Sequence, residues 1–305
     1  MIGEVAMNSR EPIADSPPCN LCGSQSARHL YRQLRITVCN QCGLVRADDP
    51  TDRESLERLY SESYFRSSDS GALGYDDYMA DREKISRTFH KRMEEIETWV
   101  KHKGRLLDVG CAAGFSLVVA GARGWETNGV EISKFACELG RSELDVDIFC
   151  GSLAEADFKP ESFDVITMWD YIEHSADPSS DLALANRLMK TSGLLALTTP
   201  DISSFPARIS GSRWMGIKQK EHLFYFSRET INRLLDKHGF EPVLFRHVGK
   251  YIDGSFFSKR IGLYSRALQR LLERLTTLLG IRDKIFYVNP YDIMLVYGIK
   301  KRPTE

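Results

Sequence analysis

From about residue 104 onward, short apolar runs alternate with stretches whose apolar residues recur at helical spacing. The apolar runs predict strands at 106–109, 125–131, 146–149, 163–168 and 194–198. The stretches between them predict helices near 114–122, 133–142 and 178–190. Strands that alternate with helices form a parallel sheet with helices on both faces. The pattern therefore predicts an α/β fold for this part of the chain.

Further elements are predicted on either side of this region. A helix near 228–238 begins after Ser227, a favourable N-cap residue, and ends at Gly239. Strands are predicted at 240–248 and 291–300. Upstream, the segment 77–101 repeats its apolar residues at helical spacing and predicts a helix before the first strand.

The segment 251–287 is an insertion before the last strand, and its centre predicts an amphipathic helix over 259–284. One stripe of that helix is apolar: Ile261, Tyr264, Leu268, Leu271, Leu275 and Leu278. Seven basic residues against two acidic ones give 259–284 a net charge of +5. A basic amphipathic helix can lie on an anionic membrane surface. The alternatives are a lid over the active-site rim and a homodimer contact.

Four of the seven cysteines form two Cys-x-x-Cys pairs that are separated by sixteen residues: Cys19, Cys22, Cys39 and Cys42. This spacing is typical of a zinc ribbon, predicted here over 19–48, in which four thiolates close a structural site. So short a module buries little apolar surface, so zinc would supply its folding energy. Two disulfides or a redox pair are the alternative.

Composition indicates the class of protein and its location in the cell. The chain has 305 residues, 42% of them hydrophobic, and a net charge of −1, which fits a globular protein and argues against a surface that grips nucleic acid as a whole, while leaving room for a local basic patch. No apolar run could span a bilayer, and the polar segment 1–18 lacks a signal-like apolar core, so we expect a disordered tail and a cytoplasmic protein. We interpret 49–76 as a linker or flap, whose Tyr60 and Tyr64 are candidates to wall a pocket.

A glycine-containing loop follows the first strand of the alternating region. Gly110 and Gly114 let a ligand approach the backbone, but Ala112 takes the middle position of a dinucleotide-binding loop, which disfavours a pyrophosphate and a dehydrogenase. Asp108 would repel a diphosphate and attract a cation. Glu131, at the end of the second strand, can accept the hydroxyls of a ribose. Together these residues indicate a cationic nucleoside, S-adenosylmethionine (SAM).

The motifs LLDVGCAAG (106–114), GVEIS (129–133) and SFDVI (162–166) resemble those of class I SAM-dependent methyltransferases. The resemblance spans about 77–300 and implies a Rossmann-like sheet of seven strands, the last one antiparallel. It also implies roles for individual residues: Asp108, Gly110 and Gly114 at the methionine end, Glu131 at the ribose and Ile132 at the adenine. Ser152 would replace the usual aspartate at the adenine amine. The implied cofactor-binding set is completed by Cys111, Leu153 and Trp169.

Three ionisable residues follow the fourth strand of the alternating region: Asp170, Glu173 and His174. They resemble a stretch of the ubiquinone-biosynthesis O-methyltransferases, which implies a divalent cation such as Mg²⁺ beside the acceptor hydroxyl. One alternative is that His174 alone acts as general base. The other is that Glu173 and His174 only cap the next helix.

A second histidine, His222, lies in the aromatic stretch 220–227 and is another candidate base. The alternative is a polar residue beside an aromatic core. The sequence thus favours a methyltransferase acting on a small molecule, sugar or lipid-linked saccharide, most simply by O-methylation. Sugar C-methylation, RNA methylation with the zinc ribbon gripping RNA, and a non-catalytic scaffold are the alternatives.

Overall fold

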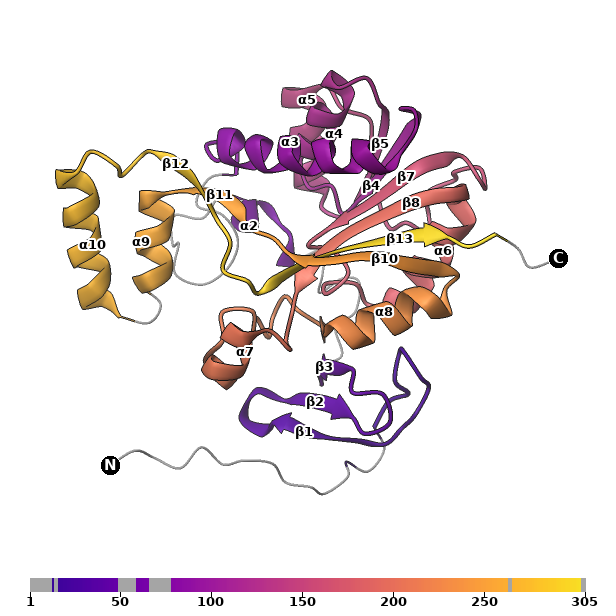
Figure 1. The fold of residues 1–305 in the computed structure, drawn as a ribbon, viewed down its shortest axis with the longest axis horizontal. Coiled ribbons are helices and arrows are strands. Elements are labelled where there is room, and N and C mark those ends of the chain that lie inside the picture. Colours follow the sequence, from indigo (N-terminus) through magenta and orange to yellow (C-terminus); the bar gives the residue numbers. More distant parts are fainter. Residues whose placement is uncertain (1–12, 14–15, 49–58, 66–77, 263–264, 303–305) are drawn as a thin grey trace.

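The computed structural model describes residues 13, 16–48, 59–65, 78–262 and 265–302 (Figure 1). The predicted tail over 1–18 and the predicted linker over 49–76 lie largely outside these ranges. The described part of the latter contains the short helix α2 (Glu62–Phe65). Within the described ranges, no helix is both long and apolar enough to cross a bilayer.

The main sheet has seven strands in the order β10-β13-β8-β7-β4-β5-β6. Their bounds are β4 (Arg105–Val109), β5 (Glu126–Glu131), β6 (Ile148–Cys150), β7 (Phe163–Trp169), β8 (Met189–Pro200), β10 (Phe240–His247) and β13 (Ile293–Lys300). The strands β4 to β8 pair in parallel, whereas β13 is antiparallel to both of its neighbours. The predicted α/β sheet with an antiparallel last strand is confirmed.

Helices cover both faces of this sheet. Figure 1 shows α3 (Arg82–Trp99), α4 (Phe115–Ala122) and α5 (Lys134–Leu144) on one side, and α6 (Pro178–Leu188) and α8 (Arg228–Lys237) on the other. Three of these helices start at side-chain caps, at Ser133, Asp177 and Ser227, the last of which forms a reciprocal capping box with Thr230. The predicted helices therefore exist, with ends that differ by a few residues.

The N-terminal module adds its three strands to a second, four-stranded sheet. It consists of β1 (Ala27–Tyr31), a 3-10 turn η1 (Arg32–Leu34), β2 (Ile36–Cys39) and β3 (Val45–Ala47). The fourth strand is β9 (Phe224–Tyr225), which pairs antiparallel with β3. Leu21 and Leu44 of the module pack in one buried cluster with Leu223 and other residues of the main body. The cysteine module is thus built into the main domain.

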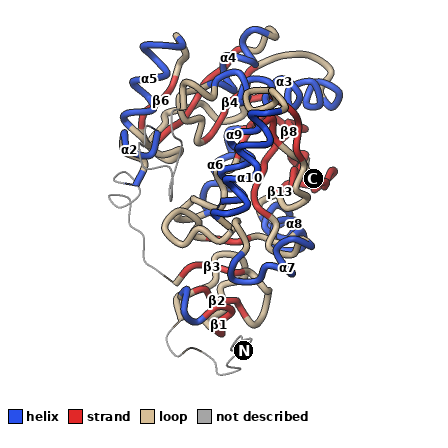
Figure 2. Tube along the Cα trace, turned by 90° about the vertical axis from the view of Figure 1, so that its left-hand side faces the viewer, coloured by secondary structure: helices blue, strands red, loops and turns tan. Residues whose placement is uncertain are grey.

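The insertion differs from the single helix predicted over 259–284. It folds as a strand, two helices and a strand: β11 (Lys250–Asp253), α9 (Gly254–Gly262), α10 (Arg266–Leu278) and β12 (Ile285–Val288). The two strands pair antiparallel and the two helices pack against each other. In Figure 2 this arm stands in front of the sheet, with β1 to β3 at the lower end of the molecule. A further short helix α7 (Phe205–Ser210) and the 3-10 turn η2 (Gly211–Arg213) follow β8.

Candidate functional site

The loop after β4 lies against the end of β5, where the amides of Gly110 and Cys111 donate to the Val130 carbonyl at 2.8 and 3.2 Å. Gly110 and Gly114 have positive φ angles of 73° and 89°, and Ala112 adopts φ 50° without being glycine. A Cβ at Gly110 would come within 2.4 Å of the Tyr171 ring, so the loop passes under this side chain.

Glu131 joins this loop to the start of α5. Its Oε2 accepts the amide of Ala112 at 2.8 Å, and its Oε1 accepts the amide of Ser133 at 2.8 Å. Burial raises the pKa of Glu131, while these two amides oppose that shift. A carboxylate in this position lies at the carboxyl end of β5, where parallel sheets bind ligands.

Asp108 ends up fully buried between β4 and its neighbours. Its carboxylate accepts hydrogen bonds from the hydroxyls of Ser116 and, at 2.6 Å, of Thr167. Burial raises the pKa of Asp108 to about 7, although the two hydroxyls and the charge of Arg92 act in the opposite direction. Its predicted contact with a cationic ligand therefore competes with partners that the protein already supplies.

A second group of side chains collects at the end of β7. Ligand atoms of Glu173, His174 and His222 lie within 4.8 Å of one another, and the two imidazole rings are 4.7 Å apart. The Glu173 Oε2 atom is buried and has no hydrogen-bond partner among the described residues. The hydroxyl of Tyr60, which lies just before α2, is 2.7 Å from His174 Nδ1.

Asp170 does not belong to this group, although the sequence grouped it with Glu173 and His174. It bonds to the Thr198 hydroxyl at 2.9 Å and pairs with Lys250 of β11. The charges of Lys250 and Arg92 outweigh its burial and hold its pKa below the usual value. In the structure, His222 rather than Asp170 completes the group with Glu173 and His174. His222 lies 48 residues after His174 in the sequence.

The four paired cysteines form a compact cage. The Sγ atoms of Cys19 and Cys42 are 3.4 Å apart, those of Cys22 and Cys39 are 3.6 Å apart, and all four lie within 4.8 Å of one another. A tetrahedral zinc with Zn–S bonds of about 2.3 Å needs sulfurs roughly 3.8 Å apart, whereas a disulfide needs about 2.0 Å. The cage therefore fits zinc, and all seven cysteines are free.

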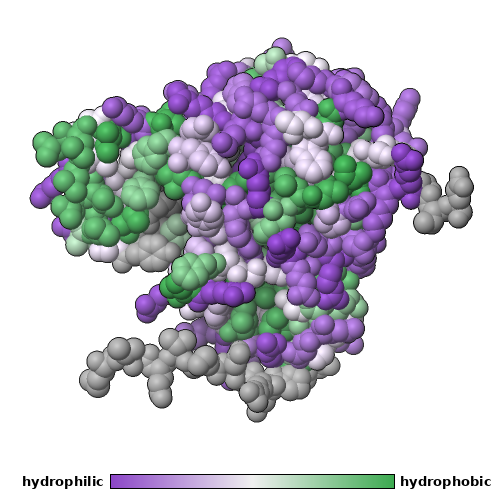
Figure 3. Space-filling view, viewed as in Figure 1, coloured by the Kyte–Doolittle hydropathy of each residue, from purple (hydrophilic) through white to green (hydrophobic). Residues whose placement is uncertain are grey.

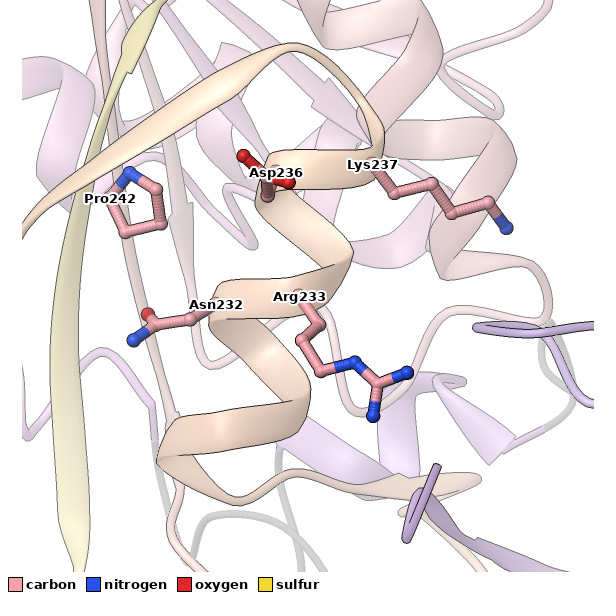
Figure 4. A pocket seen from close by; sticks show the side chains of 5 residues that line it. All are labelled: Asn232, Arg233, Asp236, Lys237 and Pro242. Carbon is pink, nitrogen blue, oxygen red and sulfur yellow. The ribbon is translucent and has the colours of Figure 1, made fainter. Parts of the chain in front are cut away.

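The cage is fastened to α6 and α8. The Asn20 side chain donates to Asp177 Oδ1 at 2.7 Å, and the Arg233 guanidinium reaches the Cys42 carbonyl at 3.5 Å. Figure 4 shows Arg233 and Lys237 on one side of α8, beside a shallow cavity of about 420 Å³ that is also lined by Asn232, Asp236 and Pro242. Four of these residues are polar and belong to α8, whereas Pro242 belongs to β10, and no predicted cofactor residue lines this cavity.

A sequence profile described as a methyltransferase domain matches residues 79–244, which is more than half of the chain. The chain belongs to this methyltransferase domain family. Similar curated proteins include the ubiquinone biosynthesis O-methyltransferases of Pseudomonas entomophila, 30% identical over 130 residues, and of Ruegeria sp., 28% identical over 153 residues. These matches cover 39% and 46% of this chain, and 56% and 61% of the relatives. The chain thus spans little more than half the length of these relatives.

Solved structures show the same fold for the methyltransferase domain. A geranyl diphosphate C-methyltransferase from Streptomyces coelicolor matches with a TM-score of 0.51 and 15% identity, over 82% of this chain and 100% of that one. A SAM-dependent methyltransferase from Archaeoglobus fulgidus matches with a TM-score of 0.50 and 19% identity, over 73% of this chain and 99% of that one. The predicted methyltransferase fold is confirmed.

The remaining predicted cofactor residues of the methyltransferase domain lie around the ends of β4 to β7. Ile132 is half-buried, and the hydroxyl and amide of Ser152 both bond to Glu155 at 2.8 Å. The other three are buried: Cys111, Leu153 and Trp169. Their contacts with SAM stay predictions.

Arg92 of α3 is a functional candidate that the sequence analysis missed. It is 6% exposed, and its Nε and Nη2 atoms have no hydrogen-bond partner in the described part of the chain. Its guanidinium lies 4.7 Å from the centre of the Trp169 ring, near the charges of Asp170 and Asp108. A buried cation with unused donors near Asp108, the residue two positions before Gly110, can bind an anionic group. The sequence did contain a signal for this candidate, because Arg92 is a charged residue within the apolar stripe predicted for the helix over 77–101.

The protonation states of the second group follow from its burial. Burial lowers the pKa of His174 to about 4, with Lys218 adding to the shift, and places the pKa of His222 well below its usual value. Burial also raises the pKa of Glu173 to about 8, with Asp170 adding to that shift. At neutral pH both imidazoles are therefore neutral and Glu173 carries a proton.

Both histidines turn their Nδ1 atoms toward the backbone. His174 Nδ1 lies 2.9 Å from the Glu221 carbonyl oxygen, and His222 Nδ1 lies 2.9 Å from that of Gly216. A carbonyl oxygen can only accept, so Nδ1 carries the hydrogen and Nε2 keeps its lone pair. Two such imidazoles and a carboxylate suit zinc, iron or manganese better than the Mg²⁺ that we expected.

Proposed function

We propose that this protein is a SAM-dependent methyltransferase that methylates a hydroxyl group of a small molecule. The single observation that carries the acceptor chemistry is the buried Glu173 carboxyl, unpartnered at Oε2, beside two neutral histidines at the end of β7. Such a group can take the proton of a hydroxyl as it becomes an ether. The similarity to ubiquinone biosynthesis O-methyltransferases supports the same acceptor class.

The glycine loop, Glu131 and Arg92 would hold SAM. Glu131 can exchange its two amide contacts for ribose hydroxyls, and the open donors of Arg92 can bind the carboxylate of the methionine part. SAM supplies an activated methyl group when it is bound. The protein then has to align the acceptor oxygen with that methyl carbon and keep water out.

The proton balance assigns a role to Glu173. The acceptor oxygen forms its bond to the methyl carbon, the carbon–sulfur bond breaks, and S-adenosylhomocysteine (SAH) is left. The hydroxyl proton passes to Glu173, which accepts it when the carboxyl is ionised, above about pH 8. Tyr60 and the Glu221 carbonyl hold the His174 ring beside this carboxyl.

The acceptor could also be activated by a metal ion held by Glu173, His174 and His222. The ion would lower the pKa of the hydroxyl and replace the general base. Treatment with a chelator separates the two routes. If the cysteine cage is shown to keep its zinc, a chelator should abolish activity in the metal route and leave it unchanged in the general-base route.

The fold alone does not select the acceptor atom, since a C-methyltransferase shares it. A sugar or lipid-linked saccharide remains a narrower form of this proposal. RNA is disfavoured, because arginines of the cysteine module are engaged internally: Arg28 with Asn40, Arg35 with the Asp48 carbonyl and Arg46 with Ser16.

The experiment is transfer of labelled methyl groups from SAM to separated small-molecule, glycolipid and RNA fractions of a cell extract. We expect label in an alkali-stable ether of a small molecule or glycolipid, and its loss in Glu173→Gln. Exposed Glu126→Gln is the matched control and should retain activity. Label confined to RNA, or equal activity of Glu173→Gln, would contradict the proposal.

A further inference from the structure

The arm formed by β11, α9, α10 and β12 leaves the main sheet and is held firmly at its base. Lys84 of α3 pairs with Asp253 at 2.5 Å, and the Thr88 hydroxyl accepts the amide of Tyr251 at 3.0 Å. The two helices of the arm therefore project from an anchored base.

The outer face of α10 is apolar and open to solvent. Leu278 is 82% exposed and Leu271 is 53% exposed, although both belong to the stripe that would face a core in an ordinary helix. The other exposed leucines of this face are Leu268, Leu275 and Leu279. Figure 3 shows hydrophobic residues gathered over this arm. We call these five leucines the leucine face.

Basic side chains border the leucine face. Arg266, Arg270 and Arg274 of α10 are exposed, as are Arg282 and Lys284 just after it. The segment 259–284 has a net charge of +5 in a chain of net charge −1, so the rest of the chain carries −6. The segment with this net positive charge is therefore also the one that exposes the leucine face.

We propose that the leucine face and its flanking arginines dock on an anionic lipid surface. Apolar side chains next to exposed cations match the acyl and headgroup layers of such a surface. A second copy of the chain would bring two arms of charge +5 together. A nucleic acid would use the arginines but leave the leucines in water. Charge complementarity thus favours the lipid surface. This docking does not depend on the proposed methyl transfer.

Co-sedimentation of the full chain with vesicles tests this docking. We expect the protein to pellet with vesicles of phosphatidylcholine and phosphatidylglycerol, but not with phosphatidylcholine alone, and to be released by high salt. The double variant Leu271→Ser/Leu278→Ser should lower the partition coefficient by about tenfold or more. Arg270→Glu/Arg274→Glu should do the same.

The matched control reverses two exposed charges elsewhere on the surface, as Lys101→Glu/Lys159→Glu, and should bind vesicles like the parent. SAH binding and circular dichroism of every variant report whether the main domain is folded. Equal pelleting with both vesicle types, no pelleting at all, or parental binding by either arm variant would overturn the proposal. So would a dimer, seen by light scattering, that the leucine variant dissociates while vesicles bind neither form. RNA binding that needs the arginines but not the leucines, without vesicle binding, would also overturn it.

Discussion

Replacing Arg92 by methionine should weaken ligand binding without a comparable loss of folding stability. Two donors of this 6% exposed side chain lack partners in the described part of the chain, and each such buried group costs about 1–3 kcal/mol. The contact with the Trp169 ring at 4.7 Å offsets about 1–2 kcal/mol of that cost. Methionine keeps most of the stem that packs on this ring. Methionine also removes a positive charge that stabilises ionised Asp170, and this loss works against the gain. Without ligand, the stability of Arg92→Met should therefore lie within about 2 kcal/mol of that of the parent.

The same change should weaken SAH binding. A charge-assisted hydrogen bond between Arg92 and the ligand carboxylate is worth about 1.5–3 kcal/mol, so the dissociation constant should rise by about 10- to 150-fold. Isothermal titration with SAH measures the affinity, and urea unfolding without ligand measures the stability. Arg87→Met is the matched control, because Arg87 lies on the same helix, is exposed and pairs only with Glu83 among the described residues.

The reasoning is refuted if Arg92→Met binds SAH like the parent and is destabilised by more than about 2 kcal/mol. That pair of results would mean that Arg92 supports Trp169 and has no part in binding. If the Arg87→Met control also loses affinity, the loss reflects a change in α3 as a whole.

The remaining predictions concern the metal cage and two buried acids. Cys39→Ser should remove bound zinc, lower the melting temperature and impair methyl transfer more than SAH binding, because β3 of the cysteine module pairs with β9, which begins two residues after His222. Cys150→Ser is the control, and loss of zinc without loss of activity would contradict this prediction. Asp108 holds its proton up to about pH 7 when folded and only to about pH 4 when unfolded, so stability should fall as pH rises through this window. Asp108→Asn should flatten that slope in urea unfolding, and an unchanged slope would disprove the assignment. The rate should rise through about pH 8, and Glu173→Gln should remove this limb and lower kcat by about 10²–10⁴-fold; an identical pH profile of the variant would argue against a base.

The order of strands and helices was predictable because each element carries its own signal. Ser227 and Gly239 bracket α8 as N-cap and stop residue, and the antiparallel β13 followed from the family resemblance. The division of the insertion into two helices could also have been predicted, since Gly262 ends α9 and the Ser265 side chain caps α10. The continuous leucine stripe outweighed these two local signals and led to a single predicted helix.

The composition of the acceptor site could not be predicted, because it depends on long-range packing. His222 reaches His174 because the chain after it pairs with β3 of the cysteine module. Asp170 is drawn out of the group by Lys250, which belongs to an arm that begins 80 residues later. Local periodicity contains no information about such pairings. Residue types near a strand end indicated a site, but only the fold decides which of them meet.

The central claim is that one pocket binds a SAM-type nucleoside between the glycine loop and Glu131. A crystal structure of the protein with SAH tests it most directly. We predict the ribose hydroxyls at the Glu131 carboxylate, the methionine carboxylate at Arg92 and the sulfur facing the Glu173 group. Density for SAH elsewhere, or a pocket that excludes SAH and accepts a dinucleotide, would contradict the account.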